Sequence, residues 1–425
     1  MRFIADLHIH SKYSIATSND LSPEIIWKWA QLKGITVIGT GDFTHPAWLG
    51  ELRRKLEPAG NGLYRLKKGF QSHDIPDSCK ASVFFLPSVE ISCVYKKEGK
   101  TRKIHAIVFV RNLSDAAKLN RALAKIGSLA SDGRPILKLD AKSLLQMVLD
   151  SSAHAMLVPA HAWTPHFSVF GGASGFASLE ECFEELTPNV YAIETGLSSD
   201  PAMNWRLSSL ARITLISNSD AHSPNTIGRE ANIFDCEVSY DDITNAIKSK
   251  KGLIGTIEFF PQEGKYYYDG HRSCGVSMSP EETIQHNYLC PVCGRTLTLG
   301  VMHRIEKLAD KKIGIKPKGT RPFHSVVPLR EIIAVVVGVG AKSRTVDREY
   351  TRLLEKLGNE LNILTTISLE DLERAGSTRL AEAVSRMRKG DVNITPGFDG
   401  EYGKVRIFDD AERSIRHYRA GGGEN

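Results

Sequence analysis

The sequence lacks long hydrophobic runs and has few cysteines and little net charge. None of its 425 residues lies in an uninterrupted apolar stretch long enough to span a bilayer, which takes about 18 residues or more. No transmembrane helix and no membrane partner are therefore expected. The opening residues, MRFIADLHIHS, reach Asp and His before the apolar core of a signal peptide has formed, so a cytoplasmic protein is predicted.

Charge and cysteine content narrow the protein class only slightly. Lys and Arg number 55 against 49 Asp and Glu, and the net charge of +6 is too small to indicate a nucleic-acid-binding protein by itself. Seven mostly scattered cysteines predict reduced thiols, with room for a metal site, rather than disulfides. Hydrophobic residues at 41% and charged residues at 24% are typical of a globular protein and exclude a mainly disordered chain.

Three regions differ in pattern along the chain. Residues 1–255 alternate short apolar runs with amphipathic stretches, which predicts an α/β domain with a largely parallel sheet closed into a barrel. Residues 256–319 are rich in aromatic and cysteine-bearing turns, and residues 320–425 predict an α/β or helical C-terminal region. In the first region we expect strands at Phe3–Leu7, Thr36–Gly39, Val83–Ser88, Ile104–Val110, Ala155–Pro159, Ala192–Glu194 and Thr214–Ser217, and helices at Pro23–Lys33, Leu113–Ser128, Ala141–Ser151, Ser178–Leu186 and Tyr240–Ser249.

Histidines and carboxylates gather in or just after the expected strands. They are His8, His10, Asp42, His45, Glu90, His105, His161, Glu194, Asp220 and His222. A lone strand histidine is usually a packed residue, but charged groups at five strand ends are costly to bury unless they are paired or bound to metal. Imidazole and carboxylate donors suit Zn, Mn, Mg or Fe, and close metal ions clamp a phosphate and activate water. The pattern predicts two or three divalent ions that hydrolyse a phosphate ester.

The motifs DLHIHS, PSVEIS, KIHAIV, PAHAW and SDAHS resemble, in order, those of the PHP (polymerase and histidinol phosphatase) superfamily. The resemblance implies a distorted (β/α)7 barrel. It implies one ion on His8, His10, Glu90 and Asp220, a second on Glu90, His105 and His161, and a contribution of His222 to a third. Asp42, with His45 beside it, stands where many members have a histidine ligand. Glu90, Glu194 and Asp220 are the expected catalytic carboxylates, with Glu194 either a ligand, a group behind the ligands or a proton shuttle.

A second cluster combines cysteine and histidine. His271 and Cys274 precede the pair Cys290 and Cys293, which are two residues apart and followed by glycine. Two such pairs at this separation predict one structural zinc ion. His286 and His303 compete with His271 as the fourth ligand. A closed site of this kind stiffens a segment without a core of its own.

The positive charge is concentrated in residues 300–348, which contain 11 Lys and Arg against four Asp and Glu. Such a run is usually a solvated surface. Next to a zinc module and a phosphate-hydrolysing site, a contact with a polyanion becomes the better interpretation. The predicted DNA-binding residues are Lys311, Lys312, Lys316, Lys318 and Arg344.

The combination of these motifs with YYYDGHRSC, CPVCG and PGFDGEYGKVRIF resembles the endonuclease Q family over nearly the whole chain. The resemblance implies a metal-dependent DNA repair endonuclease that nicks 5′ of hypoxanthine, uracil, xanthine or an abasic site. It implies double- or single-stranded DNA as partner, association with the nucleoid, and contact with repair or replication proteins such as a sliding clamp. The loop after PAHAW offers Phe167, Phe170 and Gly171 as a lesion pocket.

Two alternatives of different class stay open at this point. One is another PHP activity, a small phosphoesterase or a 3′–5′ exonuclease. The other is a DNA-binding, helicase-associated module whose barrel has lost its metals.

Overall fold

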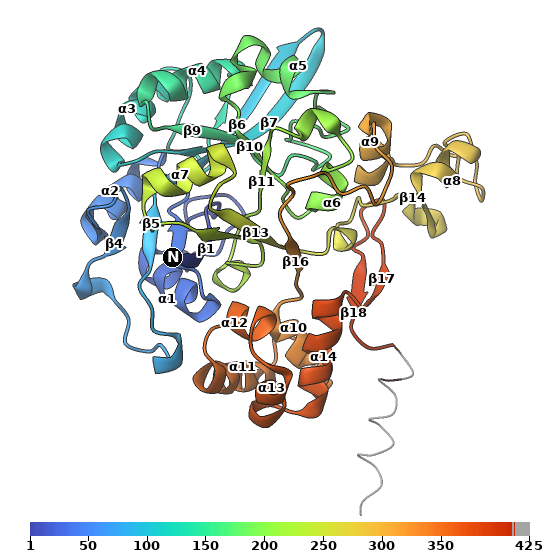
Figure 1. Cartoon of the computed structure of the whole chain (residues 1–425). Coiled ribbons are helices and arrows are strands. Elements are labelled where there is room, and N and C mark those ends of the chain that lie inside the picture. The colour runs from blue at the N-terminus through green and yellow to red at the C-terminus, as the bar shows by residue number, and fades with distance from the viewer. Residues whose placement is uncertain (410–411, 413–425) are drawn as a thin grey trace, which may run out of the picture.

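The structure is a computed structural model that describes residues 1–409 and residue 412. Residues 410–411 and 413–425, the end of the predicted C-terminal region, lie outside the described residues. An α/β body carries a projecting lobe on one side and a bundle of helices below it (Figure 1). We call the lobe the cysteine module (residues 269–299) and the helices α10–α14 the helical bundle. The predicted α/β class is confirmed by this alternation of strands and helices.

The largest sheet of the body mixes parallel and antiparallel strands. Its strand order is β16-β13-β12-β1-β2-β5-β4-β3. β1 is parallel to β2 and antiparallel to β12, and β2 is parallel to β5. The strands are β1 Arg2–Asp6, β2 Val37–Gly39, β3 Leu56–Pro58, β4 Tyr64–Leu66, β5 Phe84–Leu86, β12 Ala231–Asp235, β13 Leu253–Glu258 and β16 Phe323–Ser325.

A second ladder corrects the expectation of a largely parallel sheet. β6 and β7 form a hairpin whose register runs from Ser88↔Phe109 to Lys97↔Lys100. Only Glu98 and Gly99, both with positive φ, join them, and a connection this short permits only an antiparallel pair. β7 is also antiparallel to β9. The strands of this ladder are β6 Ser88–Lys97, β7 Lys100–Phe109, β8 Ile136–Leu137 and β9 Met156–Pro159, and β10 Ala192–Glu194 and β11 Thr214–Ile216 form a parallel pair.

Backbone hydrogen bonds connect these separate ladders at their functional ends. The Ala162 amide donates to the Glu194 carbonyl over 2.9 Å, and the His10 amide donates to the Ala221 carbonyl over 3.0 Å. The chain segments that follow β1, β9, β10 and β11 therefore lie beside one another. Closure into a (β/α)7 barrel stays a prediction. The ends of these strands nevertheless lie close enough together for their side chains to form one site.

Three helices begin and end where the sequence predicts. α1 Pro23–Lys33, α4 Ala141–Ser151 and α7 Tyr240–Ser249 are each preceded by a side chain that accepts a hydrogen bond from the first turn, namely Ser22, Asp140 and Ser239. α3 Leu113–Leu123 is shorter than expected, and α5 Leu179–Phe183 gives way to the 3₁₀ helix η3 Glu184–Asn189. The remaining helices of the body are α2 Pro46–Lys55 and α6 Pro201–Asn204.

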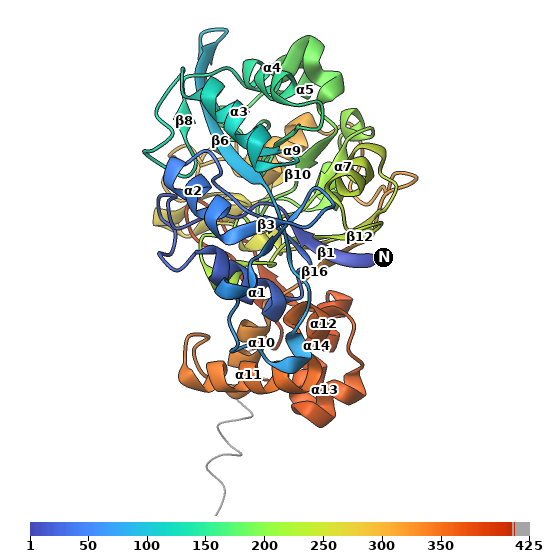
Figure 2. The same ribbon diagram turned by 90° about the vertical axis from the view of Figure 1, so that its left-hand side faces the viewer.

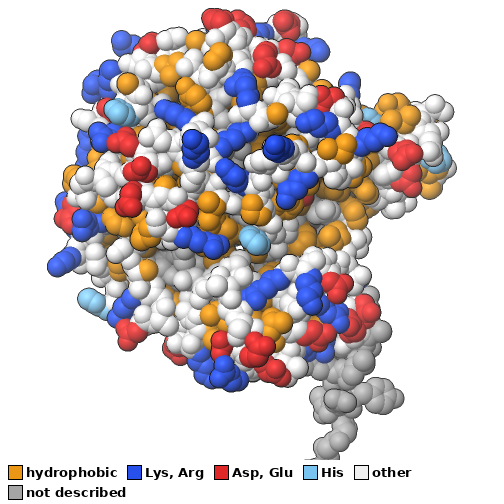
Figure 3. Space-filling model, viewed as in Figure 1, with side chains coloured by type: hydrophobic (Ala, Val, Ile, Leu, Met, Phe, Trp, Pro, Cys, Tyr) orange, Lys and Arg blue, Asp and Glu red, His pale blue; other side chains and the backbone are white. Residues whose placement is uncertain are grey.

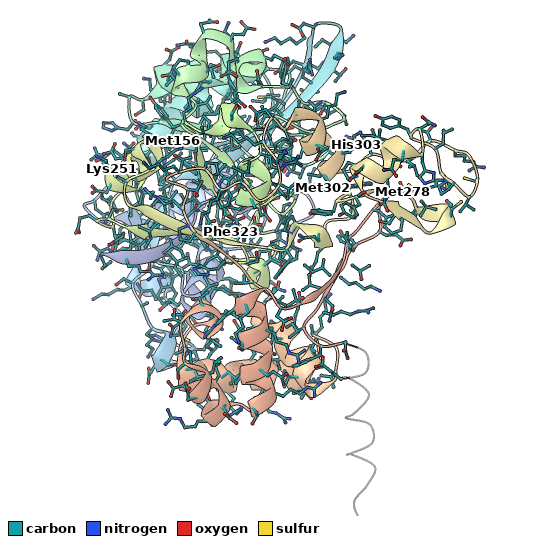
Figure 4. All side chains as sticks on the ribbon, turned by 45° about the vertical axis from the view of Figure 1, so that its right-hand side comes forward. Met156, Lys251, Met278, Met302, His303 and Phe323 are labelled. Atoms are coloured by element: carbon teal, nitrogen blue, oxygen red, sulfur yellow. The ribbon has the colours of Figure 1, made fainter. Side chains whose placement is uncertain are left out.

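The cysteine module has a small core of its own. Met278, Cys290 and Leu297 are its buried hydrophobic residues. It consists of β14 Asp269–His271, β15 Val276–Met278 and α8 Pro280–Gln285, followed by α9 Val301–Leu308. Figure 4 shows Met278 in the projecting lobe and His303, on α9, at its junction with the body.

The helical bundle packs against the body beside α1 (Figure 2). β16 first pairs in parallel with β13, so the chain returns to the body before the bundle begins. The Nζ atom of Lys33 on α1 lies 2.6 Å from Oε2 of Glu360, and both side chains are 3% exposed. The bundle consists of α10 Leu329–Val337, α11 Arg344–Leu357, α12 Glu360–Thr365, α13 Leu369–Ala375 and α14 Thr378–Lys389, with β17 Asn393–Thr395 and β18 Lys404–Arg406 after it.

Hydrophobic packing continues from the body into this bundle. One cluster of buried side chains includes Ile26 and Ala30 of α1 together with Leu353 and Leu361 of the bundle. Within the described part of the chain, no helix has the length and apolar character needed to cross a membrane.

Candidate metal centre

Two groups of potential metal ligands lie at the end of the body where β1, β9, β10 and β11 terminate. In the first group, His8, His10, Glu90 and Asp220 each offer one ligand atom within 4.8 Å of the others. Asp220 Oδ1 is 3.0 Å from Nε2 of His10 and 3.6 Å from Nε2 of His8. Glu90 Oε2 is 3.3 and 3.7 Å from the same two nitrogens. The set matches the first group predicted from the sequence.

The second group shares Glu90 with the first. Glu90 Oε1 lies 2.7 Å from Nδ1 of His105 and 2.9 Å from Nε2 of His161. Its other oxygen, Oε2, faces the first group. One carboxylate therefore contacts both groups, as a residue that bridges two metal ions must.

The residues fit divalent ions in chemistry as well as in position. Nε2 of His8 is buried and has no hydrogen-bond partner, and a buried polar atom without a partner is costly. A metal ion would satisfy this atom. The mixture of imidazole nitrogen and carboxylate oxygen suits zinc, manganese or iron.

The charges within the two groups stabilise one another. Burial raises the pKa of Glu90, but the imidazoles of His105 and His8 outweigh this effect and hold the pKa well below its ordinary value. Burial lowers the pKa of His105 to about 4 despite the opposing charge of Glu90. Burial lowers the pKa of His8 and His10, but the neighbouring carboxylates outweigh this effect and raise both values well above the ordinary one. Because metal ligation requires ionised carboxylates and neutral imidazoles, metal binding would displace protons from His8 and His10.

Glu194 contacts the ring nitrogen of His8 that lies away from the other potential ligands. Its Oε1 and Oε2 lie 3.0 and 3.2 Å from Nδ1 of His8. It also accepts hydrogen bonds from the His161 amide at 2.7 Å and from Nδ2 of Asn218 at 2.9 Å. A carboxylate that accepts the proton of Nδ1 directs the lone pair of Nε2 towards the metal position. Of the roles left open for Glu194, this geometry is that of a group behind the ligands.

Asp42 holds His10 in a similar way and lies outside both ligand groups. Its Oδ1 is 3.1 Å from Nδ1 of His10. Its Oδ2 accepts hydrogen bonds from the amide and hydroxyl of Ser11 at 2.7 and 2.6 Å and from the Ser14 hydroxyl at 2.8 Å. With both oxygens engaged, Asp42 orients a ligand rather than joining one of the two groups.

The structure does not bring His45 or His222 into either group. Nε2 of His45 lies 3.2 Å from the carbonyl oxygen of Ala130. Nδ1 of His222 donates to the backbone carbonyl of Asp220 over 2.8 Å, and its ring centroid is 4.5 Å from that of His10. His222 thus borders the first group, while His45 is engaged elsewhere.

Three residues at this end of the body have a strained backbone. Asp42, His161 and Asp220 have φ values of 51°, 26° and 46°, in the left-handed region that side chains with a Cβ atom rarely adopt. Each such residue costs about 1–3 kcal/mol and persists where the surroundings and function require it. The strain therefore marks the same end of the body that carries the ligand groups.

Sequence reasoning missed Arg134. Its NH1 atom lies 3.0 Å from Oε2 of Glu90, with the side chain 23% exposed. Arg134 follows Gly133 in a loop without hydrophobic periodicity, and only the packing of that loop against the site brings the guanidinium there. A partly exposed cation next to the ligand groups can contact an anionic substrate directly.

The cysteine module brings together the four residues predicted to hold zinc. The ligand atoms of His271, Cys274, Cys290 and Cys293 lie within 4.8 Å of one another, and Cys293 Sγ is 3.5 Å from Nδ1 of His271. Of the competing ligands, His303 instead places Nδ1 2.7 Å from Oδ2 of Asp269. This donor set suits a closed tetrahedral zinc site.

The loop predicted to form a lesion pocket is only partly available for that purpose. Phe170 is 1% exposed and packs against Trp163, with 4.9 Å between ring centroids, so its ring has almost no free surface to offer a base and its place in a lesion pocket stays a prediction. A Cβ atom on Gly171 would lie 2.3 Å from the Thr164 carbonyl, so this glycine is required by close packing. Phe167 is half-buried, and its ring centroid is 4.7 Å from that of His105.

An open cavity lies between this loop and the residues that connect the cysteine module to α9. Its volume is about 550 Å³. Its first lining residue, Trp163, follows His161 by two positions in the chain. Its lining comprises Trp163, Pro165, His166, Gly172, Ala173, Tyr266, Thr298, Leu299, Gly300, Val301, His303, Arg304, Lys307 and Asp399.

The predicted DNA-binding lysines lie on the connector, which we define as residues 309–322. Lys312, Lys316 and Lys318 are exposed, whereas Lys311 is half-buried. Figure 3 shows Lys and Arg side chains gathered on this face of the body. Arg344 is exposed at the start of α11, on the helical bundle.

Comparison with solved structures identifies the arrangement. The chain is similar to the lesion-specific endonuclease PfuEndoQ from Pyrococcus furiosus, with a TM-score of 0.84, 30% sequence identity and coverage of 96% of both chains. The chain belongs to the endonuclease Q family. A structure of endonuclease Q in complex with a 27-mer duplex carrying an abasic lesion is also similar, with a TM-score of 0.82, 30% identity and coverage of 96% of this chain and 98% of that one.

The YqxK protein of Bacillus subtilis is 28% identical over 418 residues, which are 95% of this chain and 99% of that protein. Two further matches of this endonuclease Q family member cover only part of the chain. The family model of the MJ0043 C-terminal domain matches residues 328–391, which include the helical bundle. The MJ0043 protein of Methanocaldococcus jannaschii is 32% identical over 253 residues. That match spans 58% of this chain and 31% of the relative, so the chain covers about a third of that protein's length.

Proposed function

We propose that this member of the endonuclease Q family is a metal-dependent DNA endonuclease. It would cut the phosphodiester on the 5′ side of deaminated bases and abasic sites. The observation that carries the proposal is the pair of ligand groups sharing Glu90, in a chain similar over 96% of its length to a lesion-specific endonuclease.

The ligand groups would hold two divalent ions, which when bound lower the pKa of a coordinated water and neutralise charge on the phosphoryl oxygens. Glu194 and Asp42 keep His8 and His10 oriented through their Nδ1 atoms. Asp220 is the more exposed carboxylate of the first group, at 22% of its side chain, and would be accessible to an entering phosphate.

Arg134 would bind a non-bridging oxygen of the scissile phosphate. Its guanidinium already contacts Glu90 and keeps nearly a quarter of its surface exposed. A planar guanidinium can bind a carboxylate and a phosphate oxygen at the same time. The residue would thereby position the phosphate relative to the ligand groups and offset the charge that develops on phosphorus oxygens during attack.

The cavity beside the cysteine module would receive the damaged nucleotide. A lesion base must leave the stack before an enzyme can read it, which is easier when the base is mispaired or missing. The cavity includes residues close in sequence to His161 and combines the half-buried aromatic ring of Tyr266 with the exposed imidazole of His166. This proposal replaces Phe170 with the residues that line the cavity.

The connector and the helical bundle would contact the DNA backbone through Lys311, Lys312, Lys316, Lys318 and Arg344. Replacing the four lysines with Gln should weaken binding and flatten its salt dependence, because each phosphate contact releases a counterion. An unchanged slope of log Kd against log salt would place the duplex elsewhere. A sliding clamp remains a predicted partner.

The decisive experiment uses end-labelled duplexes that contain uracil, hypoxanthine or an abasic site, incubated with magnesium, manganese or zinc. One nick on the 5′ side of the lesion, and none in the undamaged duplex, is expected. Asp220→Ala should abolish the nick, whereas Asp74→Ala, which changes an exposed carboxylate paired with Lys28, should preserve it. A ladder of mononucleotides would favour an exonuclease, and binding without cleavage would favour a metal-free module.

A further inference from the structure

A separate cavity lies between the connector and the outer wall of the body. Its volume is about 130 Å³. Its wall is formed by Trp205 and by the aliphatic residues that surround η4 (Ser208–Leu210), β11 and β13. The aliphatic lining residues are Leu207, Leu210, Ile213, Leu215 and Leu253, and none of the residues that line this cavity belongs to a metal-ligand group.

The rim of this cavity is cationic, and Asp310, which is bound to Ser208, is a neighbouring acid that interacts electrostatically with Lys311. Lys250, Lys311, Lys318 and Arg321 line it, and no Asp or Glu does. Among the residues that the structure describes, none of these four cations has a carboxylate oxygen within 4.0 Å. An excess of cationic side chains around an apolar cavity favours an anionic ligand.

Two of the cations are held together by the backbone. Arg321 NH2 donates to the Lys250 carbonyl over 2.7 Å, and Lys250 Nζ donates to the Ala211 carbonyl over 2.7 Å. Desolvation and the charge of Arg321 both lower the pKa of Lys250. The fold thus keeps two like charges close together at the rim, and an anion between them would relieve their repulsion.

The interior is suited to an apolar group rather than to a nucleobase. The Thr214 hydroxyl donates to the Ile247 carbonyl at 2.6 Å, and the Thr256 hydroxyl donates to Glu258 at 2.5 Å. The amide of Asn204 is engaged with three partners within the protein. The polar edge of a base would therefore find these groups occupied and would lose its hydrogen bonds to water on entering.

We propose that this cavity binds a small organic anion, with its apolar body inside and its carboxylate, sulfonate or phosphate group at the cationic rim. The volume limits the body to a ring or branched chain of a few carbon atoms, since an engineered protein cavity of about 150 Å³ accommodates benzene. The site is independent of DNA cleavage. It gives part of the basic connector a role besides contact with the DNA backbone.

Ligand-observed NMR titration with benzenesulfonate tests the proposal, because sulfonates are poor metal ligands and the ring matches the cavity. Benzyl alcohol serves as the neutral probe and should bind more weakly. Lys318→Gln and Arg321→Gln should each raise the Kd of benzenesulfonate by about two- to fivefold, the range of an exposed charge contact. Lys312→Gln is the matched control, because Lys312 is on the same connector but does not line the cavity.

A cavity-filling variant separates this site from general attraction to the connector. Ala211 is exposed at the rim, so Ala211→Phe should block the cavity while it leaves all the cations in place. Loss of benzenesulfonate binding with unchanged affinity for DNA is expected. Undiminished benzenesulfonate binding in Ala211→Phe, equal effects of Lys312→Gln and Lys318→Gln, or equal affinity for the neutral probe would each overturn the proposal.

Discussion

Replacing Glu90 with Gln tests whether one carboxylate serves two metal ions. The substitution preserves the length and volume of the side chain and removes its charge. In the structure, Oε1 lies 2.7 Å from His105 and 2.9 Å from His161, while Oε2 lies 3.3 Å from His10. Because the two oxygens face different groups, we expect Glu90→Gln to weaken both metal positions together.

The expected loss of metal affinity can be estimated from substitutions of residues that contact a metal ligand but not the metal. Removing a residue that merely supports a metal ligand typically lowers metal affinity by roughly 10- to 100-fold. Replacing a ligand itself should lower the affinity for each metal ion by at least the upper value, about 100-fold. This loss corresponds to about 2.7 kcal/mol of binding free energy per ion. Asp220→Asn should affect only the first position and His105→Ala only the second, because each of these residues belongs to one group.

Metal content measured by mass spectrometry after dialysis gives the readout. The loss in Glu90→Gln should equal the combined losses in Asp220→Asn and His105→Ala, while any zinc in the cysteine module stays constant across the series. Glu230→Gln is the matched control, because Glu230 is equally buried and belongs to neither group. If Glu90→Gln lost no more metal than Asp220→Asn, the shared role of Glu90 would be refuted.

Three further changes probe other parts of the molecule. Cys290→Ser should remove about one zinc ion per chain, and Cys182→Ser, outside the ligand group, should remove none. Glu360→Gln leaves Lys33 buried without its counter-charge and should lower the free energy of unfolding in urea by about 3–5 kcal/mol, whereas Asp347→Asn breaks an exposed pair and should cost under about 1 kcal/mol. Burial, and then a neighbouring carboxylate, raises the pKa of Glu263 to about 7. The folded state therefore binds this proton more tightly, and the resulting stability is lost as pH rises from about 4.5 to about 7. Glu263→Gln should show a smaller fall in unfolding free energy between about pH 5 and about pH 8, and an identical fall would contradict the assignment.

Local sequence signals account well for the helices whose ends are capped. Ser22, Asp140 and Ser239 each precede an amphipathic stretch, and the helices after them have the predicted bounds. The C-terminal shortening of α3 and the change from α5 to η3 were not predicted. Pro188, inside η3, lacks the amide hydrogen that a regular α-helix would use.

The composition of the site was also largely visible in the sequence, but the function of each residue was not. His8 and His10 share one face of a strand because side chains alternate along it, and His105, His161 and Asp220 lie in or after other strands. Asp42 was expected among the ligands, yet its oxygens are used by His10, Ser11 and Ser14. Such hydrogen bonds depend on which loops meet, and a motif does not contain that information.

The sequence by itself determined the class of the fold, the capped helices and the set of imidazoles and carboxylates available to bind metal, because these depend on local conformation and on the chemistry of single residues. Only the tertiary structure decided that Glu194 and Asp42 hold His8 and His10 rather than joining the two groups, that Arg134 contacts Glu90, that Phe170 lies in the core and that Lys311 and Lys318 of the connector line a cavity. Each of these facts depends on contacts between segments far apart in the chain, which are set by the packing of the whole molecule.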